Sequence, residues 1–454
     1  MHSADLDETV GRSRFGRLHL RVIVLCGLLI VFDGYDLTIY GASVPKMVAE
    51  FDISPAIAGA IGSAALVGMM IGAIVFGGLA DRLGRRMPII ACVVLYTVFT
   101  GAVFLATWSW EIGIYRFLAG LGLGGVMPNA VALVTEYAPA RLRSSLVSVM
   151  FSGYMVGGIA AAVLGVELIP TQGWRSLYLV GAAPLLLVPL LMRYLPESPA
   201  FMLRQGRTVE LAAILRRVDP GLPREGELRV STSEQPSSGP PVANLFRNGY
   251  GPGTAMLWIV FFMVLLMIYG LLTWLPQLMI EAGYPLGSSL SFLMTLFVAA
   301  IVITWLGGYL ADRFGTRPVL LVSYSVAAVF IAGLGFLSDS ALLWIYASVA
   351  LGGGATFAAQ IFANAYAAQY YPTYARSAGV GWALGVGRIG AIIGPLLGGM
   401  LLTAGVPLYA NFLAFAVPGL IAVTALALIP RRAPGKRADA DTPSGPVKGR
   451  TSRD

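Results

Sequence analysis

The sequence predicts an all-α integral membrane protein, in which twelve transmembrane helices form two six-helix bundles related by a pseudo-two-fold axis. Three observations predict this fold class. Hydrophobic residues make up 57% of the 454 residues and charged residues only 12%, whereas an ordinary soluble domain has roughly 25% charged residues. Apolar runs of about 20 residues, the length that crosses a bilayer, recur along the whole chain. The two halves of the chain also repeat each other in sequence.

The apolar runs give the expected spans in order. They cover 20–44, 57–79, 88–107, 111–134, 144–167, 177–195, 255–279, 289–310, 318–337, 341–368, 377–402 and 407–429. Residues 1–19 are polar and contain no short apolar segment with a cleavage site, so the first span is expected to be retained. The chain is therefore divided into an N-terminal tail (1–19), a first bundle (20–195), a central loop (196–250), a second bundle (251–430) and a C-terminal tail (431–454).

The basic residues predict the orientation. Of the 31 lysines and arginines, only Lys46 and Arg175 fall in odd-numbered loops, and Arg116 and Arg388 fall inside spans. The others lie in the tails and the even-numbered loops. By the positive-inside rule both termini are cytoplasmic, as expected of a multi-pass protein of the cell inner membrane. The net charge of +8 then reflects topology, and no nucleic-acid partner is expected.

The internal repeat is clearest after spans 2 and 8. Gly77, Leu79, Ala80, Asp81, Arg82, Gly84 and Arg86 recur at a constant offset as Gly308, Leu310, Ala311, Asp312, Arg313, Gly315 and Arg317. Two six-span halves related in this way predict a binding site near the membrane midplane, between the halves, with one half rocking against the other.

The repeated segment also resembles a known signature. "GGLADRLGRR" and its second copy "GYLADRFGTR" are similar to the signature loop of the major facilitator superfamily. This resemblance implies the major facilitator fold and transport by alternating access. Asp81 and Arg82 can make charge-assisted bonds across helix ends and so latch one of two states; the simpler alternative is a tight turn with positive-inside arginines. The expected gating residues are Gly77, Asp81, Arg82, Gly84, Arg86, Arg143, Asp312, Arg313 and Arg317.

Three further segments resemble one branch of that superfamily, the aromatic acid:proton symporters. They are "DGYD" in span 1, "RFLAGLGLGGVMPN" in span 4 and "TEYAPARLRS" at the end of span 4. The resemblance implies proton-coupled import of small aromatic carboxylates such as hydroxybenzoates. One element departs from the pattern of many drug antiporters: their Gly-Pro-x-x-Gly-Gly sequence is missing from span 5, and a copy lies at 394–399 in span 11. This departure weakens an export function without excluding it.

The buried carboxylates predict a proton carrier. Asp33 and Asp36 share one helix face inside span 1. An ionised Asp at the centre of a span costs at least ~2.5 kcal/mol, and two carboxylates this close in a poorly hydrated site are not both expected to be ionised. We expect Arg116 to set the charge state of the pair, although Asp and Arg could also neutralise each other simply to fix helix register. Glu136, at the end of span 4, is expected to serve either proton transfer or a gate bridge.

The expected substrate site is built around Arg388, the only basic residue near the midplane. Its planar guanidinium matches a carboxylate through two hydrogen bonds. The polar pair Gln360 and Asn364 on span 10 suits a ring hydroxyl, whereas the stacking side chain, for example Phe357 or Trp382, is left open. The complete set of expected substrate contacts is Arg388, Tyr40, Asn129, Tyr269, Gln360 and Asn364.

The sequence therefore predicts a secondary transporter and not an enzyme. It contains no Walker loop, metal-ligand cluster or nucleophile elbow, so the energy source is expected to be the proton gradient, with no cofactor or metal. The expected partners are an aromatic carboxylate, protons and lipid, and the chain is expected to act as a monomer. Three alternatives remain open: a symporter of a sugar or aliphatic acid, favoured by "PESP" at 196–199; a proton-coupled exporter; and a receptor that senses aromatic acids.

Overall fold

The computed structural model describes residues 2–218, 228–231, 243–246, 249–337 and 341–430. The predicted C-terminal tail at 431–454 and the remaining parts of the central loop lie outside the described residues.

Twelve stretches of helix in the described residues are long and apolar enough to cross a membrane. The first bundle contains α2 (Arg17–Phe51), α3 (Pro55–Leu83), α4 (Arg86–Ala102) with the 3₁₀ turn η1 (Val103–Leu105), α5 (Ser109–Tyr137), α6 (Arg143–Gln172), and a sixth span made of α7 (Arg175–Gly181), η2 (Ala183–Leu187) and α8 (Val188–Tyr194). The second bundle contains α12 (Gly251–Glu281), α13 (Leu286–Phe314), α14 (Thr316–Leu334), α15 (Leu342–Tyr370), α16 (Thr373–Thr403) and α17 (Leu408–Leu428). The predicted fold class is confirmed, and each predicted apolar run falls on one of these spans.

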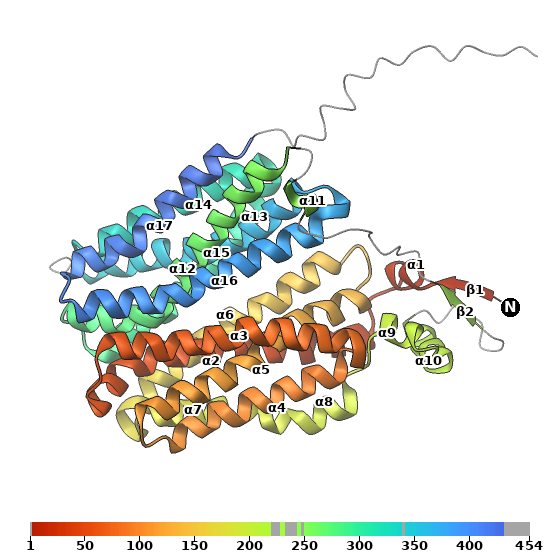
Figure 1. Ribbon diagram of the computed structural model, residues 1–454, viewed down its shortest axis with the longest axis horizontal. Coiled ribbons are helices and arrows are strands. Elements are labelled where there is room, and N and C mark those ends of the chain that lie inside the picture. Colours follow the sequence, from red (N-terminus) through yellow and green to blue (C-terminus); the bar gives the residue numbers. More distant parts are fainter. Residues whose placement is uncertain (1, 219–227, 232–242, 247–248, 338–340, 431–454) are drawn as a thin grey trace, which may run out of the picture.

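Short elements outside the spans gather at one end of the molecule. They are β1 (His2–Asp5), α1 (Leu6–Gly11), α9 (Pro199–Arg204), α10 (Thr208–Val218), β2 (Leu228–Ser231) and α11 (Ala243–Phe246). Strands β1 and β2 pair in parallel, and α1, α9 and α10 share a small apolar core formed by Leu6, Val10, Met202, Leu211 and Leu215. We name this end the tail side (right in Figure 1) and the opposite end the short-loop side. These segments, predicted only as a tail and a loop, form structure that their sequence did not indicate.

The sequence repeat recurs in three dimensions. Gly84 and Gly315, at equivalent positions, have φ angles of +87° and +89°, which L side chains rarely adopt. The guanidinium of Arg86 donates to the carbonyl of Met192 near the end of α8. Its counterpart Arg317 donates to the last carbonyls of α17, over 2.9 and 3.1 Å. Each arginine therefore satisfies carbonyl groups that the sixth helix of its own bundle leaves without an intrahelical partner.

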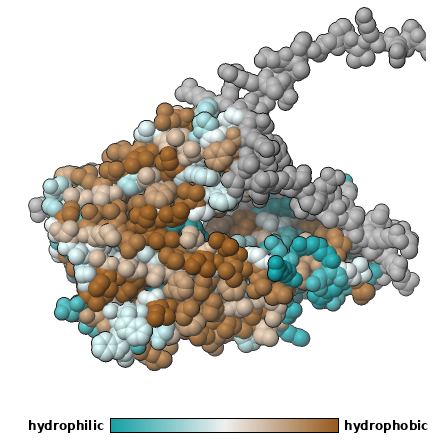
Figure 2. Space-filling view, viewed as in Figure 1, coloured by the Kyte–Doolittle hydropathy of each residue, from teal (hydrophilic) through white to brown (hydrophobic). Residues whose placement is uncertain are grey.

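The two bundles are joined on the short-loop side and separated on the tail side. Helix α3 packs against α16, α6 against α13, and α2 against α12. At the short-loop end of α3, the backbone N–H of Ala56 donates to Thr403 over 2.9 Å, and Gly59 packs so tightly that an added Cβ would lie 2.5 Å from the carbonyl oxygen of Pro395. Toward the tail side, four glycines of the same two helices face open space: Gly77, Gly78, Gly381 and Gly385. Figure 1 shows the bundles diverging toward the tail side, and Figure 2 shows the surface hollowed between them there.

Apolar side chains cover the flanks of both bundles, as the brown surface in Figure 2 shows. Large examples are exposed in this structure, among them Leu186 at 82% and Trp305 at 75%. An apolar surface of this extent around twelve long helices is what a lipid environment requires, since lipid tails stabilise exposed hydrocarbon.

Candidate functional site

Asp33 and Asp36 lie one turn apart on α2, and each is 1% exposed. Their partners differ. Asp36 Oδ2 accepts a hydrogen bond from Arg116 Nη1 over 2.6 Å, and its Oδ1 accepts one from the Thr100 hydroxyl, also over 2.6 Å. Arg116 Nη1 lies 3.3 Å from the carbonyl oxygen of Asp36 as well. Both carboxylate oxygens of Asp36 are therefore satisfied by charged or polar donors from α4 and α5.

Tyr40 supports this ion pair. The guanidinium carbon of Arg116 lies 5.2 Å from the centre of the Tyr40 ring, a cation–π geometry. The Tyr40 hydroxyl donates to the carbonyl of Ala58, and the ring packs directly on Gly62. Because the ring and the hydroxyl are both engaged inside the first bundle, we reassign Tyr40 from substrate contact to support of Arg116.

Asp33 has no such partners. Its Oδ1 atom is buried and accepts no hydrogen bond from any described residue. The charged group that acts most strongly on it is Arg388 of α16, followed by Asp36. Asp33 is therefore a buried carboxyl group with a free oxygen, and its main electrostatic partner belongs to the other bundle.

Arg388 extends from the second bundle toward the first. Its Nη1 lies 3.5 Å from the Tyr269 hydroxyl on α12 and 4.0 Å from the sulfur of Met69 on α3. The side chain is partly exposed, and no carboxylate among the described residues lies within 4.0 Å of it. The structure thus brings together Arg388, Tyr269 and Asp33, three of the predicted site residues, and leaves the guanidinium available to an anion.

Three aromatic rings connect the bundles beside this group. Phe357 of α15 packs against Phe297 of α13 with ring centres 5.4 Å apart, and against Tyr154 of α6 with ring centres 6.4 Å apart. Tyr154 also lies next to Tyr269. The sequence analysis missed Tyr154 and Phe297. A usable signal existed for Tyr154, because the glycines around it in "SGYMVGG" indicate close helix contact.

The remaining predicted contacts for the aromatic ring and its hydroxyl are Trp382, Gln360 and Asn364. Trp382 is 45% exposed and stacks on Trp258 of α12. Gln360 and Asn364, on the same helix as Phe357, have side-chain oxygens that are buried without a hydrogen-bond partner among the described residues.

A cluster of polar residues joins α3, α4, α5 and α9 on the tail side. Arg85 approaches Glu136, with Nε 3.4 Å from Oε1, and donates from Nη1 to the Asn129 side chain over 3.2 Å. The Ser198 hydroxyl donates to the second oxygen of Glu136. Glu197 accepts the backbone N–H of Arg85 over 2.6 Å. We call these five residues the Glu197 cluster.

The Glu197 cluster changes one prediction and contains one acidic residue that was not predicted. Asn129 was expected in the substrate wall, but it is fully buried and its amide also donates to the carbonyl of Gly125 over 2.8 Å. We therefore reassign it to the cluster. Glu197 itself was missed; the signal was present as the acid in "PESP", which directly follows the sixth span.

The predicted latch residues make no bond between the bundles within the part of the chain that the structure describes. The Asp81 carboxylate is 64% exposed and lies 3.9 Å from Arg85 of its own bundle. Four further charged residues among the predicted gating residues are also exposed: Arg82, Arg143, Asp312 and Arg313. This agrees with the separation of the bundles on the tail side, where such a latch would have to close.

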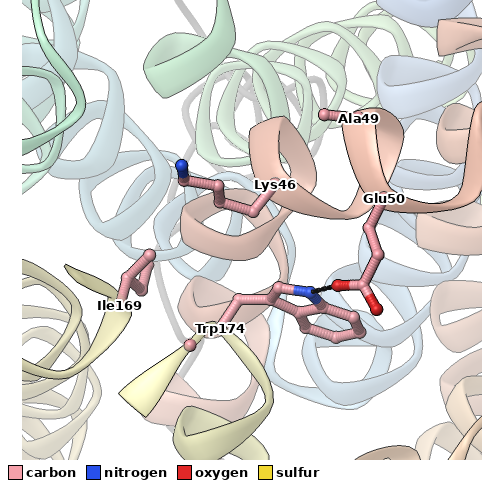
Figure 3. Close-up of a pocket in the computed structure, with 6 residues that line it drawn as sticks. Lys46, Ala49, Glu50, Ile169 and Trp174 are labelled. Atoms are coloured by element: carbon pink, nitrogen blue, oxygen red, sulfur yellow. Dashed lines mark hydrogen bonds between the residues drawn. The ribbon is translucent and has the colours of Figure 1, made fainter. Parts of the chain in front are cut away.

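A pocket of about 390 Å³ lies on the short-loop side, between the ends of α2, α6 and α7. Its lining includes Lys46, Glu50 and Trp174. The Trp174 indole N–H donates to Glu50 over 2.6 Å, drawn as the dashed line in Figure 3, and Lys46 points away from this pair. Arg175 also neutralises Glu50, and the remaining charged residue of the lining, Lys46, is exposed to solvent, whereas Arg388 is only partly exposed. In the described residues no group of three or more His, Cys, Asp or Glu side chains could hold a metal ion.

Comparisons with known proteins agree with this geometry. The model of the Major Facilitator Superfamily matches residues 26–363 and 288–452. The chain is 40% identical over 432 residues to the benzoate transport protein of Acinetobacter baylyi, covering 94% of this chain and 92% of that protein. It is 36% identical over 428 residues to the 4-hydroxybenzoate transporter PcaK of Pseudomonas putida, covering 92% and 94%. The inward-open structure of the xylose transporter XylE from E. coli matches with a TM-score of 0.72 at 16% identity, covering 93% of this chain and 99% of that one, a likeness of fold.

Proposed function

The chain belongs to the Major Facilitator Superfamily, and from this premise we propose that it is a symporter that imports small aromatic carboxylates together with protons. Relatives named for transport of benzoate and of 4-hydroxybenzoate, each aligned over more than nine-tenths of the chain, support this substrate class. They differ in whether the ring carries a hydroxyl, so they do not select between these substrates.

The observation that carries the proposal is the unpaired guanidinium of Arg388 at the interface of the bundles. A carboxylate can accept two parallel hydrogen bonds from it. The Tyr154 and Phe357 rings provide an apolar wall beside it for an aromatic ring. A sugar has neither a negative charge for the guanidinium nor an aromatic face for these rings.

Charge balance at the site explains the coupling. In the empty carrier we assign the charge that balances Arg388 to the Asp33 carboxylate. In the loaded carrier the substrate carboxylate balances Arg388, and a proton neutralises Asp33. With substrate alone the site has one excess negative charge, and with a proton alone it has one excess positive charge. An unpaired buried charge is costly, so both half-loaded states oppose closure of the site and only the empty and fully loaded carriers cross between states.

This scheme assigns the proton to Asp33 and a fixed charge to Asp36. From the sequence, the two carboxylates are expected to share the proton as a pair. Asp36, however, is held by Arg116 and Thr100 on both oxygens, and protonation would break a charge-assisted bond. Asp33 has a free oxygen that can accept a proton without breaking any bond.

The arrangement of the bundles provides the transport step. We assign the tail side to the cytoplasm, because the basic residues lie there, so the separation of the bundles on that side corresponds to an inward-open carrier in the inner membrane. Closure on the tail side would bring the two signature loops together. The Glu197 cluster then acts in gating, and Glu136 belongs to the gate and not to the proton path. The carrier works as a monomer, without cofactor, metal or catalytic activity.

Uptake into proteoliposomes tests the proposal. We expect the purified protein to accumulate labelled 4-hydroxybenzoate when the lumen is alkaline, and a protonophore to abolish accumulation. Xylose and succinate are the control solutes. Accumulation of either control in place of the aromatic acid would reject the substrate class, and accumulation that survives the protonophore would reject proton coupling.

A further inference from the structure

Two side-chain amides on α15 (Leu342–Tyr370) have buried oxygens without a hydrogen-bond donor. Gln360 Oε1 and Asn364 Oδ1 are both enclosed, and no described residue donates to either. A buried acceptor that has lost water without gaining a donor is unfavourable, and native proteins contain few of them. Two such acceptors one turn apart on one helix offer a bonding partner to a bound molecule that carries a donor.

The two amides lie on the same face of α15 as Phe357. At 3.6 residues per turn, Phe357, Gln360 and Asn364 fall within an arc of about 60° on the helix surface. Phe357 contacts Tyr154 of the other bundle, so this arc faces the interface of the bundles. Helix side chains tilt toward the N-terminus of their helix, and α15 begins on the short-loop side. Both amides therefore tilt from the tail side toward Phe357.

Few groups of an aromatic acid can donate a hydrogen bond to the two amide oxygens. An ionised carboxylate only accepts hydrogen bonds, so the carboxylate of the substrate cannot satisfy the amide oxygens. An unsubstituted benzene ring has no conventional donor. A phenolic hydroxyl has one O–H, which can donate to the oxygen of one amide, and its oxygen can accept a bond from the NH₂ group of the other.

We propose that Gln360 and Asn364 bind a ring hydroxyl and that the carrier therefore selects hydroxylated benzoates over benzoate. This inference rests on the proposed function, because it assumes that Arg388 binds the carboxylate. With that end held at Arg388, the hydroxyl must point away from it, as a meta or para hydroxyl does. An ortho hydroxyl bonds to its own carboxylate and cannot reach the amides.

Calorimetric binding to the purified full-length protein tests the inference with five probes: benzoate, 2-, 3- and 4-hydroxybenzoate, and 4-methoxybenzoate. We expect 3- or 4-hydroxybenzoate to bind about tenfold more tightly than benzoate, the effect of one hydrogen bond to a buried acceptor. The 4-methoxy compound keeps the oxygen but cannot donate, so it should lose the advantage. This comparison uses the unmodified protein and does not depend on how any variant folds.

Substitutions then test whether Gln360 and Asn364 cause the preference for hydroxybenzoates. Gln360→Met and Asn364→Leu remove the acceptors with little change in volume, and we expect the ratio of hydroxybenzoate to benzoate affinity to fall toward one in the double variant. Gln277→Met is the matched control: Gln277 also has a buried side-chain oxygen without a partner, but lies on α12, near its short-loop end. It should keep the ratio of the unmodified protein.

Two outcomes would overturn the inference. One is equal affinity of the unmodified protein for benzoate and all hydroxybenzoates, and the other is an unchanged preference in the double variant. Both leave the proposed function standing, because aromatic acids still bind. Failure of every aromatic acid to bind rejects the proposed function itself.

Discussion

Asp36 and Arg116 form an ion pair with an N–O distance of 2.6 Å, in which the side chains are 2% and 1% exposed. The pair links α2 to α5, and Thr100 adds a bond from α4 to the same carboxylate. Because Asp33 lies only one turn away, this linkage also fixes the position of the proposed proton carrier. Removal of one partner from a buried pair leaves an uncompensated charge, whereas replacement of both by apolar residues is often neutral or stabilising.

Arg116→Met should therefore lower the free energy of unfolding by about 3–5 kcal/mol, and the double substitution Asp36→Leu/Arg116→Met should restore most of it. Thermal unfolding of the purified protein in detergent measures both effects. Arg175→Met is the matched control, since its pair with Glu50 is on the surface, with side chains 26% and 43% exposed, and exposed pairs contribute about 1 kcal/mol or less. Equal destabilisation by Arg116→Met and Arg175→Met would contradict the structural role of the buried pair.

Asp33→Asn should separate exchange from accumulation. The amide resembles the protonated carboxyl, so a loaded site remains balanced through Arg388 and the substrate, and exchange of internal for external substrate continues. The empty site, in contrast, has an unpaired Arg388, which opposes the return step and abolishes accumulation. We also expect substrate binding to weaken as pH rises in the unmodified protein, because proton loss from Asp33 restores its competition for Arg388.

Proteoliposomes measure both processes for Asp33→Asn, by counterflow and by uptake driven by a pH gradient. Binding to the variant should no longer depend on pH over the range in which the unmodified protein responds. A variant that still concentrates substrate against a gradient would show that the proton is carried elsewhere.

Gly84 and Gly315 offer a matched test of the Glu197 cluster. Both have φ near +88°, so an alanine at either position is strained by about 1–3 kcal/mol. Only at Gly84 would the added Cβ also collide with the Glu197 carboxylate, at 2.5 Å; at Gly315 the nearest atom is 3.9 Å away. Gly84→Ala should therefore reduce the transport rate about tenfold more than Gly315→Ala, while both keep the substrate affinity of the unmodified protein. Similar rates for the two variants would show that displacement of Glu197 does not affect gating.

Features set by local composition could be predicted from the sequence. Twelve helices follow from twelve apolar runs, because an apolar segment of about 20 residues satisfies its backbone in a bilayer only as a helix. Asp33 and Arg388 stood out for the same reason, since each is a charge in the middle of such a run.

Features set by helix orientation could not be predicted. In a membrane both the lipid-facing and the core-facing sides of a helix are apolar, so the pattern of residues does not show that Phe357 meets Phe297 or that Trp382 is exposed. Contacts between distant segments were equally hidden. The bond from the backbone of Arg85 to Glu197 joins positions 112 residues apart. The same arginine donates to Asn129, a contact that the sequence does not show and without which Asn129 is predicted at the substrate site.

The contrast between the two intramembrane arginines gives the last prediction. Arg388 has no carboxylate partner in the described residues, whereas Arg116 is bound to Asp36. Arg388→Ala should therefore abolish binding of every aromatic acid, because a carboxylate at that depth would remain unpaired after desolvation. Arg388→Lys should restore binding only in part, since an ammonium keeps the charge but loses the two-pronged geometry.

Calorimetric binding over a pH series distinguishes the roles of these arginines. Arg116→Ala should keep measurable binding, with an altered pH dependence, because it frees the Asp36 carboxylate next to Asp33. Arg193→Ala, which removes an exposed arginine at the tail-side end of α8, is the control and should bind like the unmodified protein. Full affinity in Arg388→Ala, or loss of binding in an Arg116→Ala protein that is still folded by its thermal unfolding transition, would mean that the substrate carboxylate pairs with Arg116. The charge balance proposed for coupling would then have to be built around Asp36 in place of Asp33.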